Sequence, residues 1–280
     1  MIESLGGRVA VVTGAANGIG RALVTELYAE GMSVVAVDLD EEGLMSLASD
    51  LPNSEAGRVV SYKADVTEFS QVEAIRAVAS AAFGSVHLLC NNAGIIGQRG
   101  LPVWEEDPHD WRRVMDVNVV GVLHGLRAFI PGMIECRESC HVVNTASMMG
   151  WVASGQVASQ YTASKHAVVG LTETLAMEVR GKIPWLGVSV LCPGPVETGF
   201  RRRNRHFGFS EESDSIVRER AWDEDPSRIV VGPRMVARAV IDAVKSGAFY
   251  VFPNPGSQER LQHRFEHVLR SVRPSAPTDR

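Results

Sequence analysis

A tyrosine and a lysine stand four positions apart, at Tyr161 and Lys165, in a stretch whose apolar residues have helical spacing. Residues four apart lie on one face of a helix, so the phenol and the ammonium would lie side by side. A free tyrosine has a pKa of about 10 and is a poor base at neutral pH. A nearby cation favours the phenolate, and lowering this pKa to about 7 needs roughly 4 kcal/mol. The pair predicts a proton-accepting tyrosine, although either residue alone is ordinary on a helix surface.

A serine that precedes this pair adds a second hydroxyl group. Ser147 follows the apolar run 141–143 and comes just before Gly150, which places it at the expected carboxyl end of a strand. A hydroxyl there could bind a substrate oxygen as negative charge develops on it. A turn or capping serine is the common alternative, whereas a nucleophile is disfavoured because no G-x-S-x-G motif surrounds the residue.

A glycine-rich turn near the N-terminus has the context of a dinucleotide-binding site. The apolar run 9–12 leads into Gly14, Gly18 and Gly20, and a helical pattern begins at Ile19. Glycines allow a sharp turn that brings backbone N–H groups against a pyrophosphate, and the helix N-terminus adds favourable partial charge. Glycines alone are weak evidence, because tight turns also use them. The prediction of a dinucleotide site therefore depends on the strand before the cluster and the helix after it.

An acidic residue ends the next apolar run and indicates which dinucleotide is bound. Asp38 follows the run 34–37, about 20 positions beyond the glycines, where a carboxylate can accept hydrogen bonds from the adenosine ribose. The same charge would repel a 2′-phosphate, and Asn17 and Leu39 occupy the positions where a phosphate-binding arginine would otherwise be expected. A turn or helix-capping aspartate is the alternative. Together with the glycine turn, Asp38 predicts NAD rather than NADP.

The elements that must position these residues alternate along the chain. Short apolar runs rich in Val are separated by stretches with helical spacing, and runs that are apolar throughout are typical of strands buried on both faces. The runs are 9–12, 34–37, 59–62, 86–90, 141–143, 188–191 and 249–252, and the helical stretches include 19–29, 71–83, 111–134 and 161–179. This alternation predicts an α/β fold: a doubly wound parallel sheet of about seven strands with helices on both faces, the Rossmann fold.

Residues 1–280 show no repeat and no internal linker, so we expect a single domain. The segment 199–231 is irregular and polar, and its place after a strand end predicts a lid over the site. Its basic run, Arg201 to Arg205 with His206, is interpreted as a solvated surface or, alternatively, as a binding site for an anionic group. Apolar residues at helical spacing predict an amphipathic helix over 257–270, followed by a loose tail to residue 280.

Composition excludes several classes of protein. The net charge of −5 and the pI of about 5.9 give no reason to expect nucleic-acid binding. Apolar runs stay well short of the roughly 20 residues that span a bilayer, and the N-terminal residues lack the features of a secretory signal. The four cysteines form no C-x-x-C pair, so neither a disulfide framework nor a metal site is expected. A reducing, cytoplasmic location without a membrane or metal partner fits these features.

Over roughly residues 5–250, these motifs resemble the short-chain dehydrogenase/reductase family in its compact single-domain branch. The T-G-x-x-x-G-x-G turn begins at Thr13, the N-N-A-G segment at Asn91, and the Y-x-x-x-K pair at Tyr161, in the family's order. The resemblance and the residues above imply a cofactor site made of Gly14, Asn17, Gly18, Ile19, Gly20, Asp38, Leu39, Asp65, Val66, Asn92, Ala93, Gly94, Tyr161, Lys165, Pro193, Val196 and Thr198.

The resemblance also implies a reaction, the interconversion of a secondary alcohol and a ketone by hydride exchange with NAD. Tyr161 would be the general acid and base, Lys165 would lower its pKa, Ser147 would orient the substrate oxygen and Asn118 would hold a proton-relay water. Substrate contacts are expected from Ser147, Met149, Trp151, Gln156 and Tyr161. The large apolar candidates favour a bulky alicyclic substrate over a polyol.

Two departures from the family pattern and two alternative functions remain open. Ser147 and Tyr161 are fourteen positions apart, one more than is commonest in the family, and the C-terminal segment extends beyond the usual core. The first alternative is an NADPH-dependent reductase of ketones or β-ketoacyl thioesters, and the second is an NAD-binding sensor or scaffold without turnover. The resemblance also implies a homotetramer or homodimer, formed through the long helical stretches 111–134 and 161–179.

Overall fold

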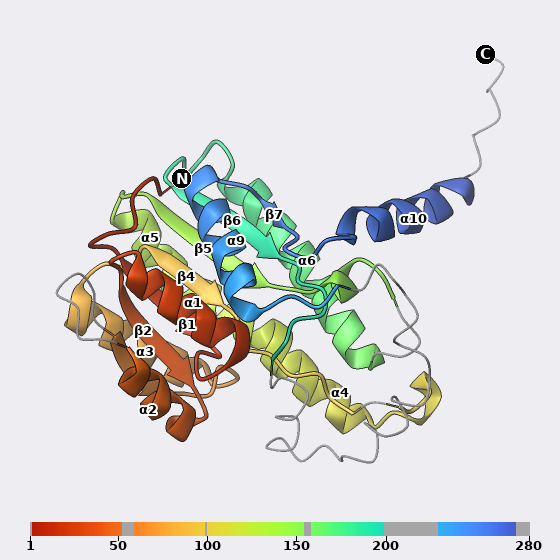
Figure 1. Ribbon diagram of the computed structural model, residues 1–280, viewed down its shortest axis with the longest axis horizontal. Helices are drawn as coiled ribbons and strands as arrows, with labels where there is room; N and C mark the ends of the chain where they lie inside the picture. The colour runs from red at the N-terminus through yellow and green to blue at the C-terminus, as the bar shows by residue number, and fades with distance from the viewer. Residues whose placement is uncertain (1, 52–58, 99, 154–157, 199–228, 273–280) are drawn as a thin grey trace.

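A parallel sheet of seven strands lies between two layers of helices in the computed structural model (Figure 1). The structure describes residues 2–51, 59–98, 100–153, 158–198 and 229–272. The strands are β1 (Val9–Thr13), β2 (Ser33–Asp38), β3 (Val59–Lys63), β4 (Leu88–Asn91), β5 (Cys140–Thr145), β6 (Leu186–Leu191) and β7 (Tyr250–Val251). Each coincides with one of the seven apolar runs, so the predicted fold class is confirmed.

Helices lie on both faces of this sheet, and the C-terminal helix extends away from it (Figure 1). They are α1 (Gly18–Ala29), α2 (Glu41–Asp50), α3 (Phe69–Phe83), α4 (Pro108–Met115), α5 (Gly121–Glu135), α6 (Ser159–Val179), α9 (Pro233–Ser246) and α10 (Ser257–Arg270). Short turns of other helix types are η1 (Val103–Glu105), η2 (Asp116–Val120), which is a π-helix, and η3 (Met148–Gly150). The predicted C-terminal helix over 257–270 is present as α10, whereas most of the predicted lid, 199–228, lies outside the described residues.

The strand order, β3-β2-β1-β4-β5-β6-β7, contains one reversal of direction. The chain runs outward from β1 to β3 and then returns to begin β4 beside β1, from where it runs outward the other way. In open sheets of this kind the crevice at the carboxyl ends of the two central strands is the place where ligands bind. We therefore expect the ligand-binding site at the loops after β1 and β4.

The core is divided between the two faces of the sheet, as the period of two along each strand requires. Ala10 and Val12 of β1 face the layer of α1, α2 and α9, while Val11 between them faces the layer of α3, α5 and α6. Neighbouring strands repeat this pattern and their residues are almost completely buried. Burial on both faces explains why these strands are mainly apolar instead of alternating between apolar and polar residues.

One long helical stretch, Pro108–Glu135, is apolar and long enough to cross a membrane by length and composition alone. Its residues Leu126, Phe129 and Met133 are buried against the sheet. This stretch, which comprises α4, η2 and α5, is therefore a core helix of the α/β fold.

Candidate active site

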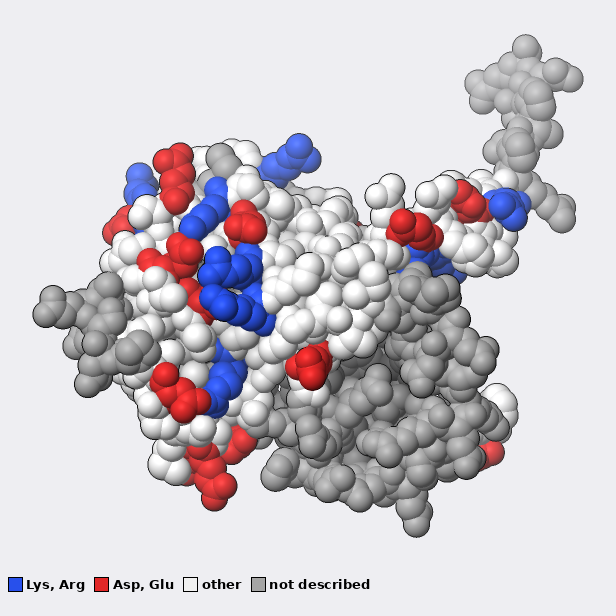
Figure 2. Space-filling model, in the orientation of Figure 1, with Lys and Arg blue, Asp and Glu red and all other residues white. Residues whose placement is uncertain are grey.

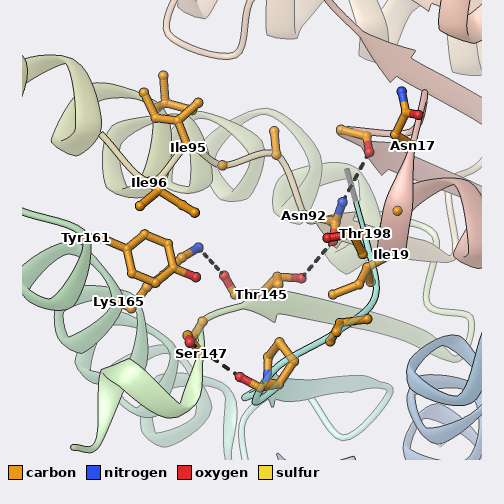
Figure 3. Close-up of a pocket in the computed structure, with 18 of the residues that line it drawn as sticks. Asn17, Ile19, Asn92, Ile95, Ile96, Thr145, Ser147, Tyr161, Lys165 and Thr198 are labelled. Carbon is orange, nitrogen blue, oxygen red and sulfur yellow. Dashed lines mark hydrogen bonds between the residues drawn. The ribbon is translucent and has the colours of Figure 1, made fainter. Parts of the chain in front are cut away.

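A cavity of about 510 Å³ opens at the carboxyl edge of the sheet and collects residues from the ends of six strands. Most of the predicted site residues line it: Gly14, Asn17, Gly18, Ile19, Asp38, Leu39, Asp65, Val66, Asn92, Ala93, Gly94, Ser147, Met149, Tyr161, Lys165, Pro193, Val196 and Thr198. Figure 3 shows Ser147, Tyr161 and Lys165 at one end, and Asn17, Ile19 and Thr198 toward the other. One continuous cavity thus joins the expected cofactor residues to the expected catalytic residues.

Four predicted site residues are placed differently. Gly20 lies behind the turn, where an added Cβ would overlap the Gly14 carbonyl oxygen, so its role is close packing. Asn118 is completely buried beside the cavity. Trp151 does not line the cavity, and Gln156 lies outside the described residues.

A hydroxyl that the sequence motif contains, but to which no role was assigned, holds the glycine turn in place. The Thr13 hydroxyl oxygen accepts hydrogen bonds from the backbone N–H groups of Asn92, at 3.0 Å, and Ala93, at 3.1 Å. In return, the Asn92 side-chain amide donates to the Thr13 carbonyl oxygen at 3.0 Å. These bonds join the loops after β1 and β4 across the switch point of the sheet. A polar residue that ends a buried strand directly before the glycines is the sequence signal for this role.

The turn leaves room for a ligand because two of its residues lack a side chain. Gly14 and Gly18 have φ angles of 66° and 52°, in the left-handed region that favours glycine. A Cβ at Gly14 would lie 2.9 Å from the Ala93 Cα, and one at Gly18 would lie 3.0 Å from the Thr198 Cγ2. Helix α1 begins at Gly18, so its N-terminal backbone amides are suited to a pyrophosphate.

Asp38 ends β2 with its carboxylate held at the edge of the cavity. One oxygen accepts from the Ala16 backbone N–H at 2.9 Å, and the other accepts from the Asp40 backbone N–H at 3.0 Å. The neighbouring Leu39, which also lines the cavity, is 41% exposed. The carboxylate is therefore fixed in position and can accept further hydrogen bonds from a ribose through its remaining lone pairs.

Tyr161 and Lys165 lie on one face of α6, as their spacing predicts. The Lys165 Nζ lies 5.7 Å from the centre of the Tyr161 ring and donates to the Thr145 carbonyl oxygen at 2.8 Å. Ser147 follows β5, where its hydroxyl caps η3 by accepting from the Met149 backbone N–H at 3.1 Å. The end of β5 therefore positions both the serine and, through Thr145, the lysine.

Burial and hydrogen bonding set the proton affinities of these groups. Burial raises the pKa of Tyr161, and a hydrogen bond from Ser147 opposes this rise. Burial lowers the pKa of Lys165 from 10.5 to about 8. The lysine is therefore still mainly an ammonium at pH 7, whereas the tyrosine keeps its proton until further positive charge approaches it.

Asn118 lies in the π-helical turn η2, a distortion often found at functional sites. Its side-chain amide donates to the Ile95 carbonyl oxygen and to the Ser164 hydroxyl, each at 2.9 Å, and accepts from the Ile95 backbone N–H at 2.8 Å. The amide thereby fixes the loop after β4 against α6. A Cβ at Gly94 in this loop would lie 3.1 Å from Asn118 Oδ1 and 3.4 Å from the Lys165 Nζ.

The catalytic end of the cavity is otherwise mainly apolar. Its lining there includes Ile95, Ile96, Met148, Met149 and Val230. Figure 3 shows Ile95 and Ile96 on the side facing Tyr161 and Ser147. Such a lining suits a hydrocarbon skeleton, with the few polar groups left to orient it.

Trp151 packs behind this lining instead of entering it. Its ring makes edge contacts with Tyr250, 5.5 Å between centres, and with Phe265 of α10, 6.1 Å between centres. The indole N–H points to the Cys192 sulfur at 3.2 Å. Trp151 thus connects the catalytic loop to α10, and the direction of its side chain could not be inferred from its position in the sequence.

Arg260 is among the cavity residues that were not expected from the sequence. Arg260, in the first turns of α10, is half-buried and lines the same cavity as Tyr161. The apolar spacing of this segment predicts the helix, but it does not show that a charged residue of the helix reaches the site.

Comparison with known proteins decides the family. The model of the short chain dehydrogenase family matches residues 8–207, more than half of the chain. The chain belongs to the short-chain dehydrogenase family. This dehydrogenase is 35% identical to 1-deoxy-11-beta-hydroxypentalenate dehydrogenase of Streptomyces exfoliatus over 265 residues, which cover 95% of the chain and 90% of the relative.

Two further comparisons place the dehydrogenase among its relatives. It is 37% identical over 195 residues to 3beta-hydroxysteroid dehydrogenase 2 of Eggerthella lenta, covering 69% of the chain and 73% of that protein. A short-chain dehydrogenase/reductase from Burkholderia phymatum, solved in complex with NAD, superposes with a TM-score of 0.85 at 34% identity over 100% of both chains. The dehydrogenase is therefore an oxidoreductase whose relatives act on hydroxyl groups.

Proposed function

We propose that this dehydrogenase uses NAD to interconvert a secondary alcohol and a ketone on a bulky, apolar, alicyclic substrate. The observation that carries the proposal is the single cavity that holds Asp38 at one position and Ser147, Tyr161 and Lys165 at another. A dinucleotide extends across the switch point in folds of this kind, so the nicotinamide would come next to the tyrosine.

The residues present fit the dinucleotide. The missing side chains of Gly14 and Gly18 leave space for a pyrophosphate at the start of α1, and Asp38 offers its carboxylate to the adenosine ribose. Lys165 and the segment that contains Pro193 and Thr198 would hold the nicotinamide half. When bound, NAD supplies the hydride acceptor for alcohol oxidation.

Tyr161 is the group that gives or takes the proton of the substrate oxygen. Because burial raises its pKa, the phenol keeps its proton at neutral pH and therefore has a proton to give to a carbonyl oxygen in reduction. In oxidation it must act as the phenolate, which the Lys165 ammonium and the positive ring of oxidised NAD both favour. Ser147 lies beside Tyr161 and orients the substrate oxygen by hydrogen bonding.

The apolar catalytic end and the relatives support the substrate class. Ile95, Ile96, Met148 and Met149 surround the position that the substrate would take. The names of the Streptomyces and Eggerthella relatives describe hydroxyl groups on a hydroxypentalenate and on a steroid. Large ring systems with a secondary alcohol are therefore the first substrates to test.

The test measures the turnover of cyclic and steroid alcohols with NAD and with NADP in parallel. The absorbance of the reduced nicotinamide reports the turnover. We expect oxidation with NAD, and we expect Tyr161→Phe to reduce it by about 100- to 10,000-fold while NADH binding, read from fluorescence, is kept. Tyr62→Phe is the matched control, since Tyr62 belongs to β3 and does not line the cavity. Turnover that survives in Tyr161→Phe would refute the mechanism, and preference for NADP would refute the role of Asp38.

A further inference from the structure

The first turns of α10 are tied directly to the segment that lines the cavity after β6. Asn254, just before the helix, accepts from the Gly194 backbone N–H at 2.7 Å and donates to the Pro195 carbonyl oxygen at 2.8 Å. The Ser257 hydroxyl donates to the Asn254 carbonyl oxygen at 2.7 Å. Both residues are buried. The start of α10 is thus anchored at the site, while the rest of the helix extends away from the sheet (Figure 1).

This anchoring places one charged residue at the catalytic end of the cavity. Leu261 packs against the cluster of Met148, Met149 and Val152, which also contacts Tyr161. The preceding residue, Arg260, is half-buried and lines the cavity. The contacts of its neighbour Leu261 place this part of α10 beside residues of the catalytic end.

The Arg260 backbone N–H donates to the Gly256 carbonyl oxygen, but its guanidinium forms no hydrogen bond or ion pair with another residue among those that the structure describes. Among the described residues, the carboxylates that line the cavity belong to Asp38, which ends β2, to Asp65, which follows β3, and to Glu197, which is exposed. A partly desolvated cation beside apolar side chains is stabilised when a ligand brings a negative charge to it. A guanidinium is also the side chain that binds a carboxylate through two parallel hydrogen bonds.

We propose that Arg260 binds a carboxylate of the substrate, so that this dehydrogenase acts on alicyclic hydroxy acids. The inference rests on the proposed function and narrows its substrate class. The apolar lining would hold the ring skeleton, Ser147 and Tyr161 would hold the hydroxyl, and Arg260 would hold the acid at the rim. Binding at three points fixes which carbon of the ring faces the nicotinamide.

The test compares acids with their neutral esters. The probes are alicyclic hydroxy acids of increasing size, from hydroxycyclohexanecarboxylate to hydroxysteroid acids, each paired with its methyl ester. Their affinities for the protein–NADH complex are measured by NADH fluorescence, together with the affinity for NADH itself. We expect the best acid to bind the unmodified protein at least about 10-fold more tightly than its ester.

Variants of α10 assign this preference to one side chain. Arg260→Gln is expected to weaken acid binding by about 10- to 100-fold and to leave ester and NADH binding nearly unchanged, while Arg260→Lys keeps part of the preference. Arg264→Gln is the matched control, because Arg264 lies one turn later on the same helix, is exposed and does not line the cavity. It is expected to bind acids as the unmodified protein does.

Three results would overturn the inference: no acid binds better than its ester, Arg260→Gln weakens acid and ester equally, or Arg260→Gln weakens NADH binding. The last would assign Arg260 to a phosphate of the cofactor. Turnover with NAD, recorded on the same samples, tests the proposed function separately. Acid binding that depends on Arg260 without oxidation of any alcohol would refute the proposed function and, with it, the substrate assignment, and would leave Arg260 only as a carboxylate-binding residue.

Discussion

Asp38 combines a structural and a selective role in one carboxylate. It accepts hydrogen bonds from the backbone N–H groups of Ala16 and Asp40, and it lines the cavity with its negative charge. A 2′-phosphate next to this carboxylate would be repelled, and like charges in contact cost several kcal/mol. The amide of Asn can still accept a backbone hydrogen bond but carries no charge.

We therefore expect Asp38→Asn to raise the ratio of kcat/KM with NADP to kcat/KM with NAD by roughly 10- to 100-fold. Steady-state kinetics with both cofactors measures this ratio. Asp40→Asn is the control, because Asp40 caps α2 by accepting from the Gly43 backbone N–H and does not line the cavity. An unchanged ratio in Asp38→Asn would show that the charge does not select the cofactor.

His141 gives a prediction about stability and pH. It is buried in β5, its Nε2 pairs with the Ser189 hydroxyl at 2.7 Å, and burial lowers its pKa from 6.5 to about 3. Below pH 6.5 this histidine is therefore protonated in the unfolded chain, while it stays neutral in the folded protein. Its contribution to stability is complete above pH 6.5 and falls by about 1.4 kcal/mol per pH unit down to pH 3.

Urea denaturation at pH 7 and pH 5 measures this effect. We expect the free energy of unfolding to fall by about 2 kcal/mol between the two values because of His141. His141→Gln removes the titrating group, so this loss should shrink even though the variant is less stable at pH 7. His109→Gln, at an exposed position in α4, is the matched control. If the free energy of unfolding depended equally on pH in both variants, His141 would not be the group responsible.

At the scale of elements, α5 approaches β4 closely enough to need a glycine. A Cβ at Gly125 would overlap the Asn91 side chain, which donates to the Asn144 Oδ1 at 2.9 Å between β4 and β5. Gly125→Ala is expected to lower the free energy of unfolding by about 1–3 kcal/mol, since either the helix or this hydrogen bond must move. Gly132, in the same helix, is exposed and has no atom within 4 Å of an added Cβ.

Gly132→Ala should therefore raise the free energy of unfolding by up to about 1 kcal/mol through helix propensity alone. Urea denaturation of both variants under one set of conditions compares them. Opposite signs for the same substitution in one helix would identify close packing as the cause. A similar change in both would show that Asn91 moves aside without cost.

The elements also show what the sequence can and cannot predict. The seven strands could be located because strands buried on both faces consist mainly of apolar residues. Helix α9 was not singled out, although its ends carry recognisable signals: Pro233 at the first position and Gly247 in the left-handed conformation at the end. The predicted stretch 111–134 contains the π-helical turn η2, and apolar periodicity gives no indication of such an inserted residue.

The same distinction applies to the site. Tyr161, Lys165 and Asp38 could be assigned because spacing along one element, or the end of one strand, decides where they lie. Trp151 and Arg260 depend on how η3 and α10 pack against each other, which is a tertiary contact. A residue's type and position do not determine such contacts, so Trp151 was expected in the cavity and Arg260 was not.

At the scale of the whole molecule, ion pairs lie on the outer surface of one helical layer, and large apolar side chains are exposed on the two long helices of the other. Figure 2 shows basic and acidic residues intermixed over the layer that contains α1 and α9, where Glu26 pairs with Arg234 at 2.7 Å and with Arg238 at 2.9 Å. On the opposite layer, Leu123 of α5 is 48% exposed and Met177 of α6 is 75% exposed. Large apolar side chains on the surface of long helices favour association, and ion-paired charges favour contact with water.

We therefore expect the protein to form a dimer or a tetramer through the layer of α5 and α6. Size-exclusion chromatography with light scattering should give a multiple of the 30.3 kDa chain mass. Met177→Glu places a charge in the proposed interface and should shift the protein toward the monomer, because burying an unpaired charge is costly. Met45→Glu is the matched control, since Met45 is 60% exposed on α2, in the other layer. A monomeric unmodified protein would refute the assembly, and equal masses for both variants would place the interface elsewhere.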